Sequence, residues 1–286
     1  MMSPGERTHM GDQTADSDSQ PDPATVMYRE RADALSSEAG DGPPLLCAHG
    51  TLMDRTMFDP QLAALSDEYR VAAYDLRART ERAYEPYDLW DLVEDSRAVM
   101  DSLDMEQPVV AGMSMGGFMT LRLAMEYPDE IAGIVLIDST SLPHPDDDIE
   151  LYRGMIDQIR DDDLLPRTMG ETVTHFLFGE TTREQRADLV ETWIERWRSY
   201  PGEAVYQEVS SWLERPDITE QLEGLDVPTL IVHGEEDESI DVSRVEPTVE
   251  TLDAEFELIP EAGHSSNLEN PAAVNAAIRE FLETVY

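Results

Sequence analysis

The amino-acid sequence predicts an α/β protein with a mostly parallel, doubly wound sheet and a helical insertion. From residue 43 onward, short apolar runs alternate with amphipathic stretches of helix length, which is typical of a parallel sheet covered on both faces. Between about residues 141 and 220 the β-branched runs stop, and amphipathic stretches separated by Pro and Gly remain. We therefore expect a core formed by residues 25–140 and 221–286, interrupted by a helical cap at residues 141–220.

The first part of the core contains four clear strand candidates. They cover residues 45–48, 69–74, 108–111 and 131–137, and each is a short apolar run. Helices are expected at 54–67, 89–103 and 118–125, and Asp88 is well suited to cap the second of these. Residues 26–30 also have strand character, but residues 31–39 do not alternate cleanly, so the start of the fold is ambiguous.

The later elements follow the same pattern. Within the insertion, residues 151–159 and 189–197 have helical periodicity. Strands are expected at 228–232 and 256–259, and a last helix at 272–281. Ligands of open parallel sheets bind beyond the carboxyl ends of the strands, so functional residues should be sought in the loops that follow each strand.

The charge of the chain excludes several classes of partner. It carries 62 Asp and Glu against 20 Lys and Arg, for a formal net charge of −42. Such a polyanion gains nothing from counterion release on nucleic acid, and an anionic membrane surface repels it. Because 41% of its residues are hydrophobic, it still has enough apolar surface to bury a core.

All 20 basic residues are Arg, and Lys is absent. Together with the acidic surface, this indicates adaptation to a halophilic cytoplasm. At about 1 M salt the Debye length is roughly 3 Å, so repulsion among the carboxylates is nearly screened. We predict that the fold loosens below a few hundred millimolar salt. Circular dichroism measured during dilution of KCl tests this, and an unchanged spectrum in dilute buffer would contradict it.

The N-terminal region and the cysteine content indicate a cytoplasmic protein. Residues 1–24 are polar and acidic, without the apolar run of a signal peptide, and are expected to form a disordered tail. The single cysteine, Cys47, cannot form an intramolecular disulfide. No window approaches 18 consecutive apolar residues, so no membrane span is expected.

The strongest motif is the run from Gly112 to Gly117, Gly-Met-Ser-Met-Gly-Gly, between the strand at 108–111 and the helix at 118–125. In this strand–turn–helix context, Gly-x-Ser-x-Gly is typical of a nucleophile elbow, where glycines allow a tight turn that exposes the serine hydroxyl. The helix N-terminus that follows favours developing negative charge. Ser114 is therefore the candidate nucleophile.

A serine hydroxyl needs a base that accepts its proton. Of the six histidines, His264 fits best, because it lies in a loop between the last strand and the last helix. His144 and His175 fall in the insertion, where surface or packing roles are expected. His233 ends a strand and is expected to be structural.

The base needs an acid that orients it. Asp237 follows the strand at 228–232 and precedes His264, which is the chain order serine, acid, histidine. Asp138 also ends a strand and is the alternative acid. We favour Asp237 and expect Asp138 to have a structural role, anchoring the start of the insertion.

An oxyanion hole requires two backbone N–H groups. Met115, the residue after the nucleophile, should provide one, and the loop from His49 to Met53 should provide the other. Within that loop Thr51 is the preferred donor and Leu52 the second choice.

These motifs resemble the α/β-hydrolase superfamily. The resemblance rests on His49-Gly50, the Ser114 motif, Gly-Glu-Glu-Asp ending at Asp237, and Ala-Gly-His ending at His264. The Asn-Leu-Glu-x-Pro segment at 267–271 is similar to the branch that contains 3-oxoadipate enol-lactonases, cofactor-free haloperoxidases and carboxylesterases. The resemblance implies an eight-stranded sheet whose second strand is antiparallel, a helical cap, and no cofactor or metal.

One loop departs from the family pattern. The family usually carries Asp-x-Arg-Gly-x-Gly after the second parallel strand, whereas residues 75–80 here read Asp-Leu-Arg-Ala-Arg-Thr. Both glycines are replaced, so the conformation of this loop is not expected to follow the family.

The sequence thus predicts a serine hydrolase that cleaves a small carboxylic ester or lactone through an acyl-enzyme. The alternatives are a cofactor-free haloperoxidase or perhydrolase, a C–C bond hydrolase, and a non-catalytic ligand-binding protein with this fold.

The candidate pocket residues lie close to these motifs in the sequence. They are Leu52, Met53, Arg55 and Met113. Five methionines near the motifs (53, 57, 113, 115 and 119) are interpreted either as part of an acyl pocket or as core packing. A carboxylate-bearing enol-lactone would need a basic partner, for which Arg55 and Arg153 are candidates.

Overall fold

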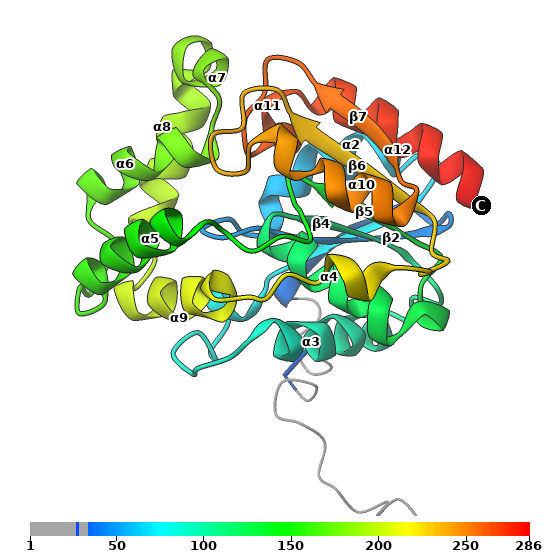
Figure 1. The fold of residues 1–286 in the computed structure, drawn as a ribbon, viewed down its shortest axis with the longest axis horizontal. Helices are drawn as coiled ribbons and strands as arrows, with labels where there is room; N and C mark the ends of the chain where they lie inside the picture. The colour runs from blue at the N-terminus through cyan, green and yellow to red at the C-terminus, as the bar shows by residue number, and fades with distance from the viewer. Residues whose placement is uncertain (1–26, 29–33) are drawn as a thin grey trace, which may run out of the picture.

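The computed structural model describes residues 27–28 and 34–286, which form a seven-stranded sheet with helices on both faces (Figure 1). The strand order is β1-β3-β2-β4-β5-β6-β7. The strands are β1 (Ser36–Ala39), β2 (Pro44–Ala48), β3 (Arg70–Tyr74), β4 (Val109–Met113), β5 (Gly133–Ile137), β6 (Thr229–Gly234) and β7 (Glu255–Ile259). The predicted α/β class with a mostly parallel sheet is confirmed.

The central strands are apolar along their whole length because both faces of the sheet are covered. Every residue of β4, β5 and β6 is buried, whereas most of the edge strand β7 is exposed. All neighbouring strands are parallel except β1 and β3. The carboxyl ends of the parallel strands therefore meet at one edge of the sheet.

The start of the sheet lies in the segment whose sequence is ambiguous. The antiparallel edge strand is β1, in the segment whose polar sequence showed no clear alternation. The expected strand at 26–30 lies largely outside the described residues, and the two residues that are described there, Met27 and Tyr28, are helical and buried. Seven strands are present in the described part of the chain.

Helices α3 (Leu89–Ser102) and α4 (Met115–Glu126) cover one face of the sheet, and α2 (Asp59–Leu65) and α12 (Pro271–Val285) cover the other (Figure 1). Asp88 caps α3 by accepting hydrogen bonds from the N–H groups of Trp90 and Asp91. The helix expected at 54–67 is divided into a 3₁₀ turn, η1 (Arg55–Phe58), and α2. Pro60 lies in the first turn of α2, the part of a helix that tolerates proline.

Five helices lie between β5 and β6, beyond one end of the sheet (Figure 1). They are α5 (Asp146–Ile159), α6 (Arg167–Leu177), α7 (Glu180–Gln185), α8 (Ala187–Trp197) and α9 (Gly202–Leu213). The shorter elements are η2 (Arg77–Arg79), η3 (Pro128–Glu130), η4 (Thr219–Leu222), η5 (Val242–Arg244), α10 (Glu246–Leu252) and α11 (Ser266–Glu269). No helix in the described part of the chain is long and apolar enough to cross a membrane.

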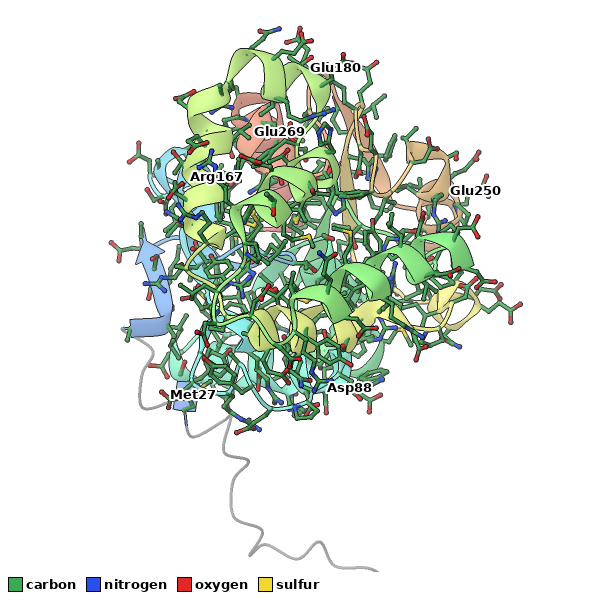
Figure 2. The ribbon with its side chains drawn as sticks, turned by 90° about the vertical axis from the view of Figure 1, so that its left-hand side faces the viewer. Met27, Asp88, Arg167, Glu180, Glu250 and Glu269 are labelled. Atoms are coloured by element: carbon green, nitrogen blue, oxygen red, sulfur yellow. The ribbon has the colours of Figure 1, made fainter. Side chains whose placement is uncertain are left out.

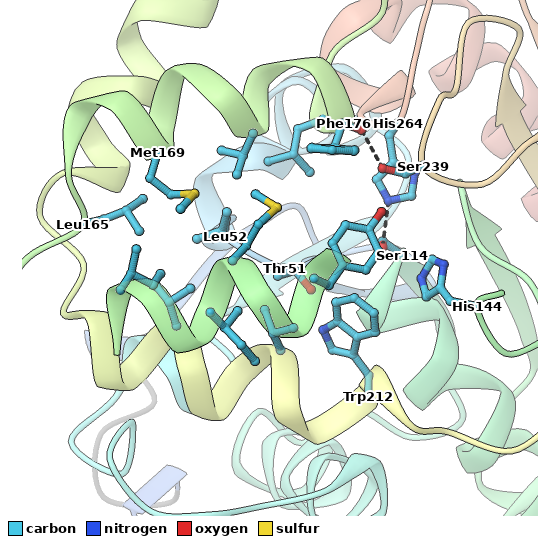
Figure 3. Close-up of a pocket in the computed structure, with 18 residues that line it drawn as sticks. Thr51, Leu52, Ser114, His144, Leu165, Met169, Phe176, Trp212, Ser239 and His264 are labelled. Atoms are coloured by element: carbon cyan, nitrogen blue, oxygen red, sulfur yellow. Dashed lines mark hydrogen bonds between the residues drawn. The ribbon is translucent and has the colours of Figure 1, made fainter. Parts of the chain in front are cut away.

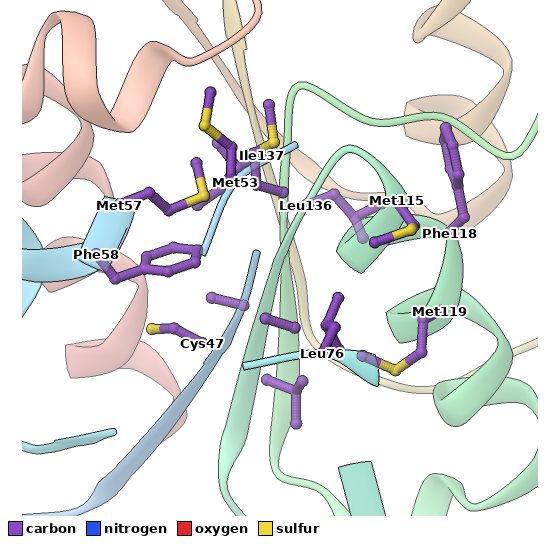
Figure 4. Packing of buried hydrophobic residues seen from close by; sticks show 14 of the residues in the cluster. Cys47, Met53, Met57, Phe58, Leu76, Met115, Phe118, Met119, Leu136 and Ile137 are labelled. Carbon is purple, nitrogen blue, oxygen red and sulfur yellow. The ribbon is translucent and has the colours of Figure 1, made fainter. Parts of the chain in front are cut away.

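The methionines near the sequence motifs belong to the hydrophobic core. Met53, Met57, Met113, Met115 and Met119 are fully buried, and Figure 4 shows four of them packed beside the central strands. The five methionines are interpreted from the sequence either as part of an acyl pocket or as core packing. None of them lines the cavity described below, so the core-packing interpretation holds. Their flexible side chains fill the core between the sheet and its helices.

Charged side chains lie mainly on the surface. Glu180 and Glu250 project outward, whereas Glu269 lies inside the molecule (Figure 2). The exposed Arg167 forms ion pairs with three glutamates of the insertion, Glu171, Glu191 and Glu195. Because such exposed pairs each contribute about 0 to 1 kcal/mol, they do little to offset the repulsion within the acidic surface.

Candidate active site

Ser114 lies in a strained turn between β4 and α4. Its φ of 48° and ψ of −112° are rare for a residue with a side chain. The turn is too tight for larger neighbours, since a Cβ on Gly116 would lie 2.3 Å from the carbonyl oxygen of Ala48. Ser139 donates a hydrogen bond to the Ser114 carbonyl at 2.9 Å, and the Ser114 N–H donates to Ile137 at 2.9 Å. These contacts hold the backbone in the conformation that presents the hydroxyl.

The structure brings the three predicted catalytic side chains together (Figure 3 shows Ser114 and His264). The Oγ of Ser114 lies 2.9 Å from Nε2 of His264, and Nδ1 of His264 lies 2.7 Å from Oδ2 of Asp237. An ionised carboxylate only accepts, so Nδ1 carries the proton that it donates to Asp237. The lone pair of Nε2 then faces the serine hydroxyl, which is the arrangement that a general base requires.

Each carboxylate oxygen of Asp237 has a separate task. Oδ1 accepts hydrogen bonds from the N–H groups of Ser239 at 2.8 Å and Ile240 at 2.9 Å, while Oδ2 contacts the imidazole. The two backbone bonds fix the rotation of the carboxylate about its side chain. Oδ2 is therefore held in place before any substrate binds.

Asp138 does not contact the imidazole through a hydrogen bond. Its Oδ1 accepts from the N–H of Gly234 and its Oδ2 from the N–H of Ser266, both at 2.8 Å. It thus ties the end of β6 to the segment just after His264. This corrects the expectation that Asp138 anchors the start of the insertion, although its role in the structure is to position backbone, as expected.

Glu269 is a second buried carboxylate beside His264, and sequence reasoning gave it no role. Its Oε1 accepts from the N–H groups of Gly263 and Ser265, both at 3.0 Å, on either side of the histidine. Its Oε2 accepts from the N–H of Gly179, in the insertion, at 2.8 Å. The loop that carries His264 is therefore fixed to both the core and the inserted helices.

The surroundings of His264 change its pKa in two opposing ways. Burial lowers the pKa. The pKa is raised, and by more, by the negative charge of Asp237, by its hydrogen bond and by the nearby carboxylates of Asp138 and Glu269. The net effect is a pKa above the ordinary value of 6.5. The charged imidazolium that forms when the serine proton is transferred is therefore stabilised.

The loop after β2 places backbone N–H groups beside Ser114. A Cβ on Gly50 would lie 3.2 Å from Cβ of Ser114, so the two segments are in close contact. The N–H groups of Thr51 and Met115 make no hydrogen bond within the described residues. The N–H of Leu52, the second-choice donor, is instead bound to Oε2 of Glu208 at 3.2 Å. This leaves Thr51 and Met115 as the free pair.

A buried ion pair supports this loop from the insertion. Glu208 of α9 and Arg79 of η2 lie 3.1 Å apart, with 0% and 6% of their side chains exposed. Glu208 accepts a hydrogen bond from the N–H of Leu52. Nε of Arg79 donates a hydrogen bond to the carbonyl of Met53 at 2.8 Å. Leu52 has a φ of 63°, so the ion pair holds the loop in an unfavourable backbone conformation. Arg79 belongs to the loop that departs from the family pattern.

His49 holds the same loop from the core side. Its Nε2 accepts from the N–H of Leu76 at 2.9 Å, so Nδ1 carries the proton and donates to the Gly50 carbonyl at 2.8 Å. Burial, with the positive charge of Arg79, lowers the pKa of His49 well below its ordinary value. The neutral ring is therefore a structural element of the turn at Gly50.

A cavity extends from Ser114 into the inserted helices (Figure 3), and its empty space together with the open solvent at its mouth is about 700 Å³. Loops after β2, β4, β5, β6 and β7 form its catalytic end through Thr51, Ser114, His144, Ser239 and His264. Helices α5, α6 and α9 form the rest of its wall with mainly aliphatic and aromatic side chains.

Only one of the four residues expected to form the pocket lines this cavity. Leu52 lines it, but Met53 and Met113 lie in the core and Arg55 pairs with Asp75. His144, expected to have a surface or packing role, lines the cavity and packs against Tyr152 and Trp212 of the insertion.

Asp138, His233 and Asp237 place potential metal ligands within 4.8 Å of one another. Protein groups already engage them. Both oxygens of Asp138 bind N–H groups, and Nε2 of His233 donates to the Ile240 carbonyl at 2.8 Å. The hydrogen bonds that shape the Asp237 loop account for this proximity, and His233 has the structural role expected of it.

Comparison with known proteins agrees with this architecture. A sequence profile described as alpha/beta hydrolase fold matches residues 43–271. A thermophilic esterase from Thermogutta terrifontis superposes with a TM-score of 0.81 at 31% identity, covering 87% of this chain and 93% of that one.

Two curated relatives are similar over most of their length. A 3-oxoadipate enol-lactonase from Acinetobacter baylyi is 25% identical, with 86% of this chain and 90% of the relative covered. A non-heme haloperoxidase from Rhodococcus erythropolis is 26% identical, with 91% and 99% covered. Because the family profile spans well over half of the sequence, the chain belongs to the α/β hydrolase fold family.

Proposed function

We propose that this α/β hydrolase is a serine esterase or lactonase that works through an acyl-enzyme on Ser114. The observation that carries the proposal is the hydrogen-bonded series from Asp237 through His264 to Ser114, which ends in the cavity. Residues 141–220 would act as the cap over this site, with residues 25–140 and 221–286 as the catalytic core.

In the acylation step, Ser114 Oγ attacks the substrate carbonyl while Nε2 of His264 takes the hydroxyl proton. Asp237 holds the imidazole in the required tautomer and stabilises its charged form. The carbonyl oxygen becomes an oxyanion that accepts hydrogen bonds from the N–H groups of Thr51 and Met115. The N-terminus of α4 adds favourable electrostatic potential at the same point.

The tetrahedral intermediate collapses when His264 gives its proton to the leaving oxygen. The C–O bond of the ester then breaks, and the acyl group remains on Ser114. Water attacks this acyl-enzyme in the second half of the reaction, with His264 again acting as base. The products are the carboxylic acid and the alcohol, or the open hydroxy acid when the substrate is a lactone.

The similar proteins support this class of reaction, since their names include an esterase and an enol-lactonase. A non-catalytic binding protein would have no need for a strained serine, an oriented base and two free N–H groups at one point. The strain at Ser114 costs stability, which is expected where backbone geometry serves catalysis.

Hydrolysis of p-nitrophenyl acetate in about 3 M KCl tests the proposal, since that salt concentration screens the acidic surface. A serine-directed phosphonate should react once per chain, and mass spectrometry should place the adduct on Ser114. Absence of hydrolysis and of labelling in folded protein would refute the proposed function.

The pH dependence should follow the raised pKa of His264. Only the neutral imidazole can act as base, so kcat/KM should fall as the pH decreases through this pKa. The half-maximal value should lie above pH 6.5, because the carboxylates around His264 favour its charged form. Initial rates measured between pH 5 and 9 at constant salt test this. A rate independent of pH over that range would contradict the assignment of His264.

A further inference from the structure

Resting on the proposed function, we infer that the cavity binds a neutral, unbranched aliphatic acyl chain and selects against substrates whose acyl group carries a carboxylate. The acyl chain would occupy the part of the cavity beyond Ser114. Four of the residues there, Ile159, Leu165, Met169 and Val173, are aliphatic or thioether side chains from α5, α6 and the segment between them.

No Asp, Glu or Arg of the described chain lines this cavity. In a protein with 62 acidic residues and 20 arginines, this wall therefore carries neither a carboxylate nor a guanidinium group. A carboxylate that entered would lose its hydration without gaining a cationic side chain as partner, whereas each methylene group would be stabilised by leaving water.

Two further titratable groups in the wall, His144 and Tyr152, are neutral. Burial lowers the pKa of His144 to about 2 and raises the pKa of the Tyr152 hydroxyl to about 12. At neutral pH both side chains are uncharged, and they pack edge to face against each other, with ring centroids 5.3 Å apart. They therefore add two uncharged aromatic rings to the wall of the cavity.

The arginines that could have bound a carboxylate are engaged elsewhere. Arg55 pairs with Asp75, and Arg153 pairs with Glu214 at 2.5 Å on the surface. The buried Arg215 stacks on Phe118, with 3.5 Å between Cζ and the ring centroid, and donates to the Leu142 carbonyl. None of the three lines the cavity.

The far end of the cavity lies on the side where the acyl group of the substrate would extend. The leaving oxygen must lie beside Nε2 of His264, which protonates it. Leu165 and Met169 lie at the opposite end of the cavity from His264, with Leu52 and Thr51 between them (Figure 3). A chain that fills this end therefore extends from the carbonyl carbon away from the leaving group.

A series of p-nitrophenyl esters from acetate to octanoate tests the inference, measured in about 3 M KCl to screen the overall charge. We expect kcat/KM to rise with chain length, by up to about fourfold for each methylene group that becomes buried. The mono-p-nitrophenyl ester of glutaric acid, whose chain ends in a carboxylate, should be at least about 100-fold poorer than the neutral pentanoate.

Variants at Met169 locate the effect. Met169→Trp should fill the far end and lower the ratio of kcat/KM for octanoate to that for acetate by about tenfold or more. Met169→Arg should raise kcat/KM for the glutarate ester relative to pentanoate, because it supplies the missing cation. Leu164→Trp is the matched control, since Leu164 is 52% exposed and does not line the cavity.

The outcomes separate this inference from the proposed function. If acetate is hydrolysed and Ser114 is labelled, but the longer esters are no better substrates, the acyl-chain inference is wrong and the serine hydrolase remains. Equal rates for glutarate and pentanoate would also overturn it, as would equal octanoate preference in Met169→Trp and Leu164→Trp. If no ester reacts and Ser114 is not labelled, the proposed function itself fails.

Discussion

Ser114→Ala should lower kcat for ester hydrolysis by about 10⁶-fold, the scale seen when a catalytic serine that acts as a unit with its base is removed. The variant loses the nucleophile, while the N–H groups of Thr51 and Met115 remain in place. A small residual rate over water, about 10³-fold, is therefore expected from oxyanion stabilisation and binding alone. Single-turnover hydrolysis of p-nitrophenyl esters, with active-site titration of the wild type, measures the change.

The matched control is Ser199→Ala, because Ser199 is exposed and its hydroxyl donates only to the Arg196 carbonyl. That variant should retain wild-type activity and phosphonate labelling. Circular dichroism and the unfolding temperature in the same salt should be close to wild type for both variants, so a lost rate cannot be attributed to unfolding. If Ser114→Ala kept more than about a tenth of the wild-type kcat, acyl-enzyme formation on Ser114 would be refuted.

The core of the site could be predicted from the sequence because strand ends are easy to find. Ser114, Asp237 and His264 each follow a short strand, and parallel strands bring such loops to one edge of a sheet. Asp138 and Asp237 both lie between Ser114 and His264 in the chain, so this order allows either acid. The 2.7 Å contact with His264 favours Asp237. The residues that support the three side chains were not found this way. Glu269 lies in the Asn-Leu-Glu-x-Pro segment at 267–271, but that local resemblance does not reveal its buried contacts on either side of His264.

Glu208 is the clearest case of a residue that sequence reasoning missed. It lies on α9 between Val205, Val209 and Trp212, at the helical spacing of an apolar face. An acid in the middle of such a face predicts a buried partner, but the partner Arg79 is distant in sequence and lies in a loop that lacks the family's glycines. The support of the loop from His49 to Met53 therefore depends on tertiary packing that no local pattern encodes.

The fold was predictable where burial imposes a pattern. The strands β4, β5 and β6 are apolar throughout because helices cover both of their faces. The edge strand β1 has the sequence Ser-Ser-Glu-Ala and no apolar alternation, since its conformation comes from pairing with β3. The helices of the insertion have amphipathic sequences, but their arrangement around a cavity follows from contacts far apart in the chain.

Asp237→Asn should lower kcat by about 10⁴-fold with little loss of stability. Asn can keep the hydrogen bonds that Oδ1 accepts from Ser239 and Ile240, and it then presents an amide N–H₂ to Nδ1 of His264. The imidazole must turn its lone pair toward that donor, so its proton moves to Nε2 and points at Ser114. The base is then unable to accept the serine proton. Because Asp237 also raises the pKa of His264, the acidic limb of the pH profile should move to lower pH.

Asp138→Asn is the matched variant, since it also replaces one oxygen of a buried carboxylate by an NH₂ group. Asp138 binds two N–H donors, one on each oxygen, and an amide can accept only one of them. The other donor would face an N–H₂ group in the interior, which costs about 1 to 3 kcal/mol of unfolding free energy. Asp138→Asn should therefore lower the unfolding temperature more than Asp237→Asn, while keeping far more of the activity. If Asp138→Asn abolished hydrolysis and Asp237→Asn spared it, Asp138 would be the acid. The 2.7 Å contact between Asp237 and His264 would then serve the structure of the loop rather than the orientation of the base.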